Sequence, residues 1–307
     1  MIDEIAAVGK PIVILTGGDP MLRDNVYEIA RYGTEKGLKM VMSPCGTLLN
    51  EENAGKLKDA GIERISISID GARAETHDDF RRVSGAFDEA IKGIENAKKA
   101  GLEFQINTTV TRVNLAELPE ILKLAIDLGA AAFHPFLLVP TGRGKDLAAQ
   151  ELSPEQYEET LNWVYDQRES VPLHFKPTCA PHYYRILRQR AHEEGLKVTP
   201  EEFGMDARAK GCLGGQGFCF ISYRGEVQIC GFLDVKCGDL NEQSFGDVWR
   251  DSPVFKQMRD LDSYHGRCGY CEYRRFCGGC RARAFELTGD YLAEEPYCVY
   301  EPKARKK

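Results

Sequence analysis

The sequence predicts an α/β fold in which a parallel sheet is followed by a smaller cysteine-rich domain. Short β-rich runs alternate with amphipathic helical stretches through the first half of the 307-residue chain. Consecutive parallel strands need a helical crossover, so this alternation indicates one parallel sheet with right-handed connections. Nine of the eleven cysteines fall between Cys212 and Cys298, which marks a second domain of different composition.

Five strands and four helices make up the predicted sheet region. The strands are expected at residues 11–16, 38–43, 64–69, 103–110 and 131–139. They do not carry one wholly polar face, which is typical of strands covered on both sides. The helices are expected at residues 23–36, 50–60, 87–100 and 115–128. Three of them are followed by a glycine that can satisfy free carbonyl groups in a left-handed conformation, at Gly37, Gly61 and Gly101.

Beyond the sheet region the predicted elements are sparser. Helices are expected at residues 154–169 and 183–194, and short strands at 218–223 and 226–230. We place the domain boundary near residue 206, giving domains of residues 1–206 and 207–307. The opening segment MIDEIAAVGK is typical of the second half of a helix, and nothing caps its start. We therefore expect that N-terminal sequence is missing ahead of Met1, and that the first strand seen here is an unpaired edge.

The composition argues against several classes of partner. The net charge is −7, and the one basic stripe is the tail at residues 303–307, so we expect no nucleic-acid partner. The sequence has neither an apolar run of eighteen residues nor a basic start, so we expect no membrane span and no signal peptide. The expected location is the cytoplasm, where disulfides are reduced and clustered cysteines indicate metal binding.

The cysteine spacing near the C-terminus is the strongest motif in the chain. It reads Cys268-x2-Cys271-x5-Cys277-x2-Cys280, followed by Cys298. Thiolates two residues apart on a tight turn can hold one metal centre, and a distant thiolate can close the site. The glycine pair inside the motif would let the backbone approach such a centre closely. Local spacing alone leaves an iron–sulfur cluster and a structural zinc both open.

A second, looser set of cysteines lies upstream. Cys212, Cys219, Cys230 and Cys237 belong to it, and Cys280 could join it as a ligand. The set predicted to hold a second cluster is Cys212, Cys219, Cys230 and Cys280. The competing interpretation is that these are small buried apolar residues, as free cysteines often are.

Polar residues and glycines gather where the predicted strands end. Ligands of parallel α/β folds usually bind at that edge of the sheet. The segments concerned are Thr16–Pro20, Ser43 with Cys45, Ser66–Gly71 and Asn107–Thr109. His134 and His182 are ambiguous, because a lone histidine is more often a hydrogen-bonded structural residue than a ligand. The sequence contains no phosphate-binding GKT loop and no Ser/His/Asp triad order, and we assign no catalytic residue.

Together these residues resemble the radical S-adenosylmethionine (SAM) enzymes that carry a C-terminal SPASM domain. GGDP at residues 17–20 is similar to the family motif that meets the methionine amino group, and SISIDG at 66–71 to the segment near the ribose. Cys212, Gly225 and Cys230 match the opening of the SPASM domain. The resemblance implies a partial (β/α)6 barrel that lacks its first strand, with SAM bound by Gly17, Gly18, Asp19, Pro20, Ser43, Ser68, Asp70 and Thr108. It also implies an auxiliary [4Fe–4S] cluster on Cys268, Cys271, Cys277 and Cys298, and it favours iron over zinc.

Within that family the chain is most similar to the branch of alternative haem biosynthesis. SPCGTLL, FHPFLLVPTGRGK, KPTCAPHYYRILRQR and GGCRARAFELTGDYLAEEP resemble the haem synthases called AhbD, with the AhbC and NirJ types as siblings. The resemblance implies radical decarboxylation of two propionates of Fe-coproporphyrin III to vinyls, and a ferredoxin- or flavodoxin-like electron partner. Arginines would clamp the substrate carboxylates. The arginines considered for this are Arg143, Arg185, Arg188 and Arg281.

One departure from the family is serious. The CxxxCxxC segment that holds the SAM-cleaving cluster belongs ahead of residue 1, and nothing in this sequence has that spacing. As written, the chain is not expected to cleave SAM reductively. Two alternatives therefore remain: another radical SAM/SPASM enzyme, acting on sirohaem side chains or on a peptide, and a non-catalytic iron–sulfur protein that carries electrons.

Overall fold

A computed structural model describes residues 1–303 of the chain, apart from the side chain of Arg143. Most of the predicted basic tail, residues 304–307, lies outside the described residues. The described chain forms two compact units. One contains Met1–Pro135 and Val171–Lys176, and the other contains Phe136–Ser170 and the chain from Pro177 onward. The domain boundary near residue 206 stays a prediction.

The first unit is built on a six-stranded sheet in the order β1-β2-β3-β4-β5-β6. The described pairings β1–β2, β2–β3, β3–β4 and β5–β6 are all parallel. The five predicted strands are confirmed, with β1 at one edge, and a short sixth strand was not predicted. The strands are β1 Ile12–Leu15, β2 Lys39–Met42, β3 Ile62–Ser68, β4 Glu103–Val110, β5 Ala132–Leu137 and β6 His174–Phe175.

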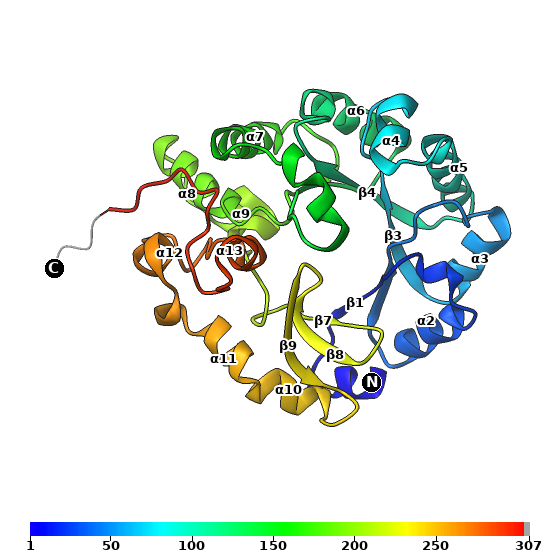
Figure 1. The fold of residues 1–307 in the computed structure, drawn as a ribbon. Coiled ribbons are helices and arrows are strands. Elements are labelled where there is room, and N and C mark those ends of the chain that lie inside the picture. The colour runs from blue at the N-terminus through cyan, green and yellow to red at the C-terminus, as the bar shows by residue number, and fades with distance from the viewer. Residues whose placement is uncertain (304–307) are drawn as a thin grey trace. The chain divides into compact units, whose positions relative to one another are not determined.

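Helices cover one face of this sheet (Figure 1). The four predicted helices are confirmed, the opening segment forms the helix α1 that its sequence indicated, and α4 is additional. The six are α1 Ile2–Val8, α2 Val26–Glu35, α3 Glu51–Asp59, α4 Ala74–Arg81, α5 Ala86–Lys99 and α6 Leu118–Leu128. Gly37, Gly61 and Gly101 have φ angles of 76°, 87° and 66°. Each follows its helix in the left-handed conformation that only glycine adopts without strain.

The two faces of the sheet differ in chemistry. On β3 and β4 every second residue is buried beneath the helices, and these residues include Ile65, Ile67 and Ile106. The residues between them are polar and half-buried, and Ser66 lies opposite Gln105 in the register. The expectation that no strand carries a polar face is therefore wrong for β3 and β4. This alternation decides which side chains share the polar side of the sheet.

The second unit contains a helical part and a cysteine-rich part. The predicted helices are confirmed as α7 Pro154–Gln167 and α8 Tyr183–Glu193, followed by the short α9 Pro200–Phe203. Ser153 and Gln156 form a capping box at the start of α7. Predicted strand 226–230 is confirmed as β8, and β7 is shorter than predicted. The remaining elements are β7 Phe220–Ile221, β8 Glu226–Cys230, β9 Leu233–Asp239, α10 Phe245–Asp251, α11 Pro253–Arg259, α12 Gly266–Tyr270 and α13 Arg281–Thr288.

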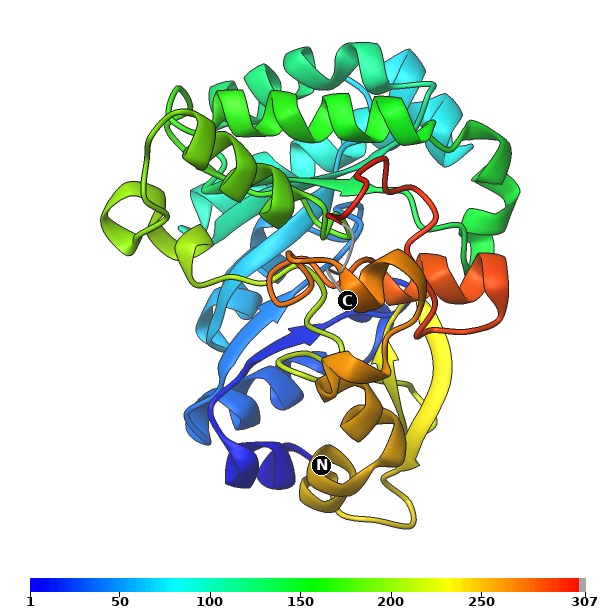
Figure 2. The ribbon, with the colours of Figure 1, turned by 90° about the vertical axis from the view of Figure 1, so that its left-hand side faces the viewer.

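The strands β7, β8 and β9 form an antiparallel sheet, drawn in yellow in Figure 2. Val227 and Ile229 of β8 point into a core that Val248 of α10 and Phe255 of α11 complete. Five cysteines of this region pack in or against that core, together with Cys179 from ahead of α8. No helix among residues 1–303 is long and apolar enough to cross a membrane.

Candidate functional site

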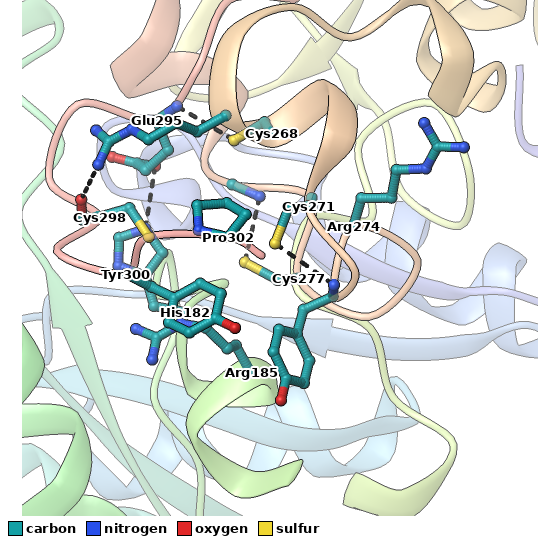
Figure 3. A pocket seen from close by; sticks show the side chains of 14 residues that line it. His182, Arg185, Cys268, Cys271, Arg274, Cys277, Glu295, Cys298, Tyr300 and Pro302 are labelled. Atoms are coloured by element: carbon teal, nitrogen blue, oxygen red, sulfur yellow. Dashed lines mark hydrogen bonds and ion pairs between the residues drawn. The ribbon is translucent and has the colours of Figure 1, made fainter. Parts of the chain in front are cut away.

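The four cysteines predicted to hold the auxiliary cluster line one cavity of the second unit (Figure 3). Cys268 lies on α12, Cys271 ends that helix, Cys277 follows in the next loop, and Cys298 comes from the C-terminal segment. The cavity holds about 410 Å³ of atom-free space, including its opening to solvent. One short helix, the loop after it and the C-terminal segment therefore bring the four thiols to one place.

Backbone amides point at these sulfur atoms. The amide of Tyr273 donates to the Sγ of Cys271 at 3.4 Å, and the amide of Gly279 donates to the Sγ of Cys277 at 3.4 Å. In both cases the donor lies two residues after the cysteine. The amide of Glu295 donates to the Sγ of Cys268 at 3.3 Å. Amide donors stabilise a charged sulfur more than a neutral thiol, so this environment suits thiolate ligands.

Two glycines make this approach of the backbone feasible. Gly278 and Gly279 have φ angles of 72° and 63°, which other residues adopt only with strain. A Cβ atom on Gly279 would lie 3.1 Å from the Sγ of Cys268 and 2.4 Å from Nη2 of Arg281. The glycine pair of the motif therefore leaves room for the sulfur atoms and for the guanidinium beside them.

The thiols themselves are in a low-dielectric environment. Burial raises the pKa of Cys271, and it raises the pKa of Cys277 well above the ordinary thiol value. Burial also raises the pKa of Cys298 to about 11. A metal centre must displace these protons to bind, and its positive charge offsets the cost of burying thiolates. Four soft thiolate donors around one cavity, with amides on three of them, fit an iron–sulfur cluster.

A group of fully buried charges lies directly behind the cavity. Arg283 and Glu295 form an ion pair, with Nη1 and Oε2 3.3 Å apart. The carboxylate of Glu295 also accepts from the amide of Cys280 at 2.5 Å. Burial tends to raise the pKa of Glu295, but the charge of Arg283, together with the amide of Cys280, outweighs it and holds that pKa below its ordinary value. Glu295 is therefore charged, and it connects the cavity wall to Cys280.

The four candidate arginines have different surroundings. Arg281 is fully buried, with Nη1 donating to Ala293 O at 2.6 Å and Nη2 to the Sγ of Cys268 at 3.6 Å. Its N–H groups donate within the segment that carries the four cysteines. This is not the environment of an arginine that binds a substrate carboxylate. Arg185 lines the cavity but is paired with Glu158, its Nη1 lying 2.8 Å from Oε1. Arg188 stacks 3.6 Å from the ring of Phe276. Arg143 lies outside the described side chains.

The predicted second set of cysteines comes together only in part. The thiols of Cys212, Cys230 and Cys280 are close enough to interact electrostatically with one another. Cys219 is not among their partners and interacts with Cys237 instead. The thiol that joins the three is Cys179, which the sequence analysis left outside the set. No local spacing could have indicated it, because it lies 33 residues ahead of Cys212.

The GGDP segment forms an open turn after β1 of the first unit. Gly17 has a φ of 145°, and nothing lies within 4 Å of a Cβ built on Gly17 or Gly18. Asp19 fixes the turn: its Oδ1 accepts from the amide of Met21 at 2.9 Å, and its Oδ2 accepts from the amide of Cys45 at 3.1 Å. This arrangement joins the turn to the loop after β2 and leaves its backbone free for a ligand.

The other residues predicted to bind SAM separate into two groups. Ser43 and Ser68 are half-buried, Ser68 on the polar face of the sheet. Asp70 and Thr108 are fully buried. The Oδ1 of Asp70 accepts from the amide of Thr109 at 2.7 Å, and its Oδ2 lies 2.5 Å from Nη2 of Arg81. The hydroxyl of Thr108 donates to Ile69 O at 2.6 Å, so both residues are engaged in holding strand ends together.

Two polar residues beside Thr108 lie on the half-buried polar face of β4, whereas Thr108 lies on its buried face. Asn107 lies opposite Ser68 in the register of β3 and β4, and Thr109 follows on the same face. Gln105 donates to Asn107 at 2.9 Å and lies 3.3 Å from Nδ1 of His134. The sequence analysis named this segment without separating its two faces. The period-2 alternation of the strand is the signal that would have done so.

Comparison with known proteins supplies the family. Residues 1–125 match the model of the radical SAM superfamily, and residues 212–280 match that of an iron–sulfur cluster-binding domain, SPASM. An AdoMet-dependent heme synthase of Oleidesulfovibrio alaskensis is 56% identical over 305 residues, which is 99% of this chain and 79% of that protein. Another of Methanosarcina barkeri is 52% identical over 301 residues, 98% of this chain and 86% of that protein.

Solved structures of low sequence identity share the fold. Streptococcus suis SuiB bound to its precursor peptide matches with a TM-score of 0.71 at 16% identity; the match covers 94% of this chain and 65% of that one, just under two thirds of its length. The enzyme anSMEcpe with bound AdoMet and a peptide matches with a TM-score of 0.65 at 18% identity, covering 97% and 84%. The open GGDP turn, the four-cysteine cavity and the relatives agree: this chain belongs to the radical SAM enzymes with a SPASM iron–sulfur domain, in the group of the AdoMet-dependent haem synthases.

Proposed function

We propose that this protein acts in the oxidative decarboxylation of two propionates of Fe-coproporphyrin III to vinyl groups, which yields haem b. The observation that carries the proposal is the identity of 52–56% over nearly the whole chain to AdoMet-dependent heme synthases. A Methanosarcina barkeri Fe-coproporphyrin III synthase and a Rhodopseudomonas palustris PqqA peptide cyclase are only 30% and 28% identical. This difference favours haem formation over sirohaem side-chain removal and over peptide modification.

The chemistry sets the demands on the protein. Removal of one hydrogen atom from a propionate β-carbon, followed by loss of carbon dioxide, gives a vinyl group only if one electron also leaves the substrate. When bound, SAM supplies the radical that takes the hydrogen atom, and an iron–sulfur cluster can accept the electron. The residues of this chain must then hold both groups, position the target carbon and tune the electron acceptor.

The first unit offers a SAM site at the carboxyl ends of its strands. The exposed backbone of Gly17 and Gly18 is open to the methionine amino group, and Asp19 keeps that turn in shape. Ser43 and Ser68 supply hydroxyls at the same strand ends. We propose a supporting role for Asp70, which fixes the ends of β3 and β4 through Thr109, Arg81 and Asn114.

The cavity of the second unit would hold the electron acceptor through Cys268, Cys271, Cys277 and Cys298. The amides on three of these sulfur atoms and the guanidinium of Arg281 on Cys268 favour the more negative, reduced form of a bound cluster. Replacement of these donors would lower the reduction potential. A centre tuned in this direction suits the acceptance of an electron from a decarboxylating substrate.

The remaining partners follow from the same proposal. The substrate carries four carboxylates. Among the described candidate arginines, Arg185 is paired with Glu158 and Arg281 donates to Ala293 O and Cys268, which leaves Arg188 as the candidate clamp. A ferredoxin- or flavodoxin-like protein would exchange electrons with the enzyme. We also propose a cytoplasmic setting, because all eleven cysteines are unpaired and the proposed clusters need reduced thiols.

Two measurements test the proposal. Fe-coproporphyrin III titrated into the anaerobic, iron-loaded protein should shift its Soret absorption and saturate at one porphyrin per chain; absence of saturable binding would contradict the substrate. A protein that also carries a CxxxCxxC segment ahead of residue 1 should form haem with SAM and dithionite. There, Cys271→Ala should abolish haem while SAM cleavage continues.

Cys237→Ala is the matched control for that variant, because Cys237 is a cysteine of the same domain outside the cavity. It should keep haem formation near the parent rate. Circular dichroism must show that both variants are folded, since a cluster can also serve only to hold a small domain together. A folded Cys271→Ala variant that makes haem at the parent rate would rule out the electron-acceptor role.

A further inference from the structure

Two polar side chains at the start of α8 line the cavity of the four cysteines. His182 immediately precedes α8, and Arg185 lies in its first turn. Because they are three residues apart, both lie on the same face of the helix. Figure 3 shows both side chains among the residues that surround the cysteine sulfur atoms.

The ring of His182 is fully buried, and neither Nδ1 nor Nε2 has a hydrogen-bond partner among the described residues. Tyr157 packs against it with ring centroids 4.9 Å apart, which accounts for a face of the ring but not for its nitrogen atoms. Nε2 lies 3.9 Å from Oε2 of Glu295, too far for a hydrogen bond, and that oxygen already accepts from the amide of Cys280. An imidazole carries at least one N–H in both its neutral and its protonated form. His182 therefore holds a buried donor without an acceptor.

Arg185 is in the same situation at one of its nitrogen atoms. Nη1 and Nη2 donate to the carboxylate of Glu158, and Nη1 also donates to Gln189 at 2.6 Å. Nε is buried and has no hydrogen-bond partner in the described chain. Burial raises the pKa of Cys298 to about 11, and the charge of Arg185 is the strongest influence against that rise. Arg185 thus acts on a predicted cluster ligand and still has a free N–H.

The unpartnered atoms are concentrated on one wall of one cavity. His182 and Arg185 supply three of the ten buried side-chain nitrogen and oxygen atoms that lack a partner within the part of the chain that the structure describes. A buried N–H without an acceptor is costly, so a folded protein that keeps one has a use for it. The sulfur atoms of a cluster in this cavity are acceptors of the right kind.

We propose that a ring N–H of His182 and the Nε–H of Arg185 donate hydrogen bonds to sulfur atoms of the cluster in the four-cysteine cavity and thereby raise its reduction potential. Donors to sulfur stabilise the more negative, reduced form of a cluster. The inference rests on the cluster site of the proposed function, and it assigns Arg185 to the electron acceptor instead of the substrate. Both residues act through the cluster and do not touch the reacting carbon.

The experiment is a redox titration of the anaerobically iron-loaded full chain, followed by electron paramagnetic resonance. The signal of the cavity cluster is the one that Cys271→Ala lacks. His182→Phe keeps an aromatic ring and removes the donor, so the ratio of reduced to oxidised cluster at a fixed potential should fall about tenfold. That change is a downward shift of about 59 mV for one electron. His182→Gln keeps an N–H donor and should recover most of the shift.

Two further variants separate the hydrogen bonds from other effects. Arg185→Lys keeps the positive charge beside Glu158 but places a methylene group where Nε lies, so its cluster should also have a lower potential than the parent. His192→Phe is the matched control, because His192 is exposed in the last turn of the same helix. It should keep the parent potential and iron content.

A folded His182→Phe or Arg185→Lys protein with the parent iron content and potential would overturn the assignment of that residue. Equal shifts in His182→Phe and His182→Gln would also exclude a hydrogen bond from His182. A failure of the cluster site itself has a different signature, since Cys271→Ala would then lose neither iron nor signal.

A second measurement covers the case in which His182→Phe does not retain iron. Chain with isotopically labelled histidine nitrogen is prepared in a His265→Gln background, because His265 lies three residues before Cys268. Pulsed electron paramagnetic resonance of its reduced cavity cluster should detect a weak coupling to the labelled nitrogen. The absence of any such coupling would exclude His182 as a donor to the cluster.

Discussion

Replacing Glu295 with glutamine removes one negative charge from the interior of the second unit while keeping the shape of the side chain. Glu295 is fully buried, and its Oε2 lies 3.3 Å from Nη1 of Arg283, which is also fully buried. The guanidinium of Arg283 donates in addition to Cys179 O and to Leu138 O. The substitution therefore leaves a buried positive charge with neutral partners and no close counter-ion that is reliably ionised.

The magnitude follows from this burial. Breaking a buried ion pair by removing one partner costs about 3–5 kcal/mol, because the remaining charge stays desolvated. Glu151 is the other carboxylate near Arg283, with 3.8 Å between Oε1 and Nε, but burial raises its pKa and weakens it as a replacement. We expect Glu295→Gln to lower the free energy of unfolding by roughly that amount. At slopes of about 2–3 kcal/mol per M, the urea midpoint falls by about 1 M or more.

The assay is urea unfolding of the iron-loaded protein under anaerobic conditions, followed by tryptophan fluorescence with the iron content measured beforehand. Glu301→Gln is the matched control, because Glu301 forms an exposed ion pair with Arg267 in the same C-terminal segment. The control should unfold at the parent midpoint, since exposed pairs contribute little. A midpoint for Glu295→Gln equal to that of the control would refute the assignment of a stabilising buried pair.

Three further outcomes are expected. Gly93→Ala places a Cβ 2.5 Å from Gly46 O and should destabilise the protein by about 1–3 kcal/mol. The control Gly55→Ala meets nothing within 4 Å and should stabilise the protein slightly. Equal urea midpoints for the two variants would contradict the close contact at Gly93. Ser153→Ala removes the cap of α7 and should cost about 1 kcal/mol in urea unfolding, an unchanged midpoint being the contrary result. Burial lowers the pKa of His134 to about 3, so the unfolded chain binds a proton at this residue first, and the free energy of unfolding falls as the pH drops below about 6.5. His134→Gln should lose less stability than the parent between pH 6.5 and 5. An identical loss of stability would exclude His134 as its cause.

Much of the first unit could be predicted because its information is local. The strands and the helices between them follow from hydrophobic period and from the glycines that end the helices, and each signal spans fewer than about fifteen residues. The helix α4 was not predicted because its sequence, AETHDDFR, has a weak apolar pattern. Contacts from a distant part of the chain hold this helix, such as those of Glu117 with Arg73 and Thr76. The short β6 was missed because two residues carry no periodicity.

The sequence alone indicated the kind of chemistry, through a cysteine spacing typical of a metal centre and a GGDP segment at a predicted strand end. Tertiary structure decided which individual side chains take part. In the folded protein Thr108 lies on the opposite face of β4 from Asn107, and Arg281 is buried among carbonyl groups. Cys179 lies near Cys280, where the sequence had led us to expect Cys219. The physical reason is range: spacing within a motif is set by a few backbone angles, whereas the meeting of residues a hundred positions apart depends on the packing of every element between them.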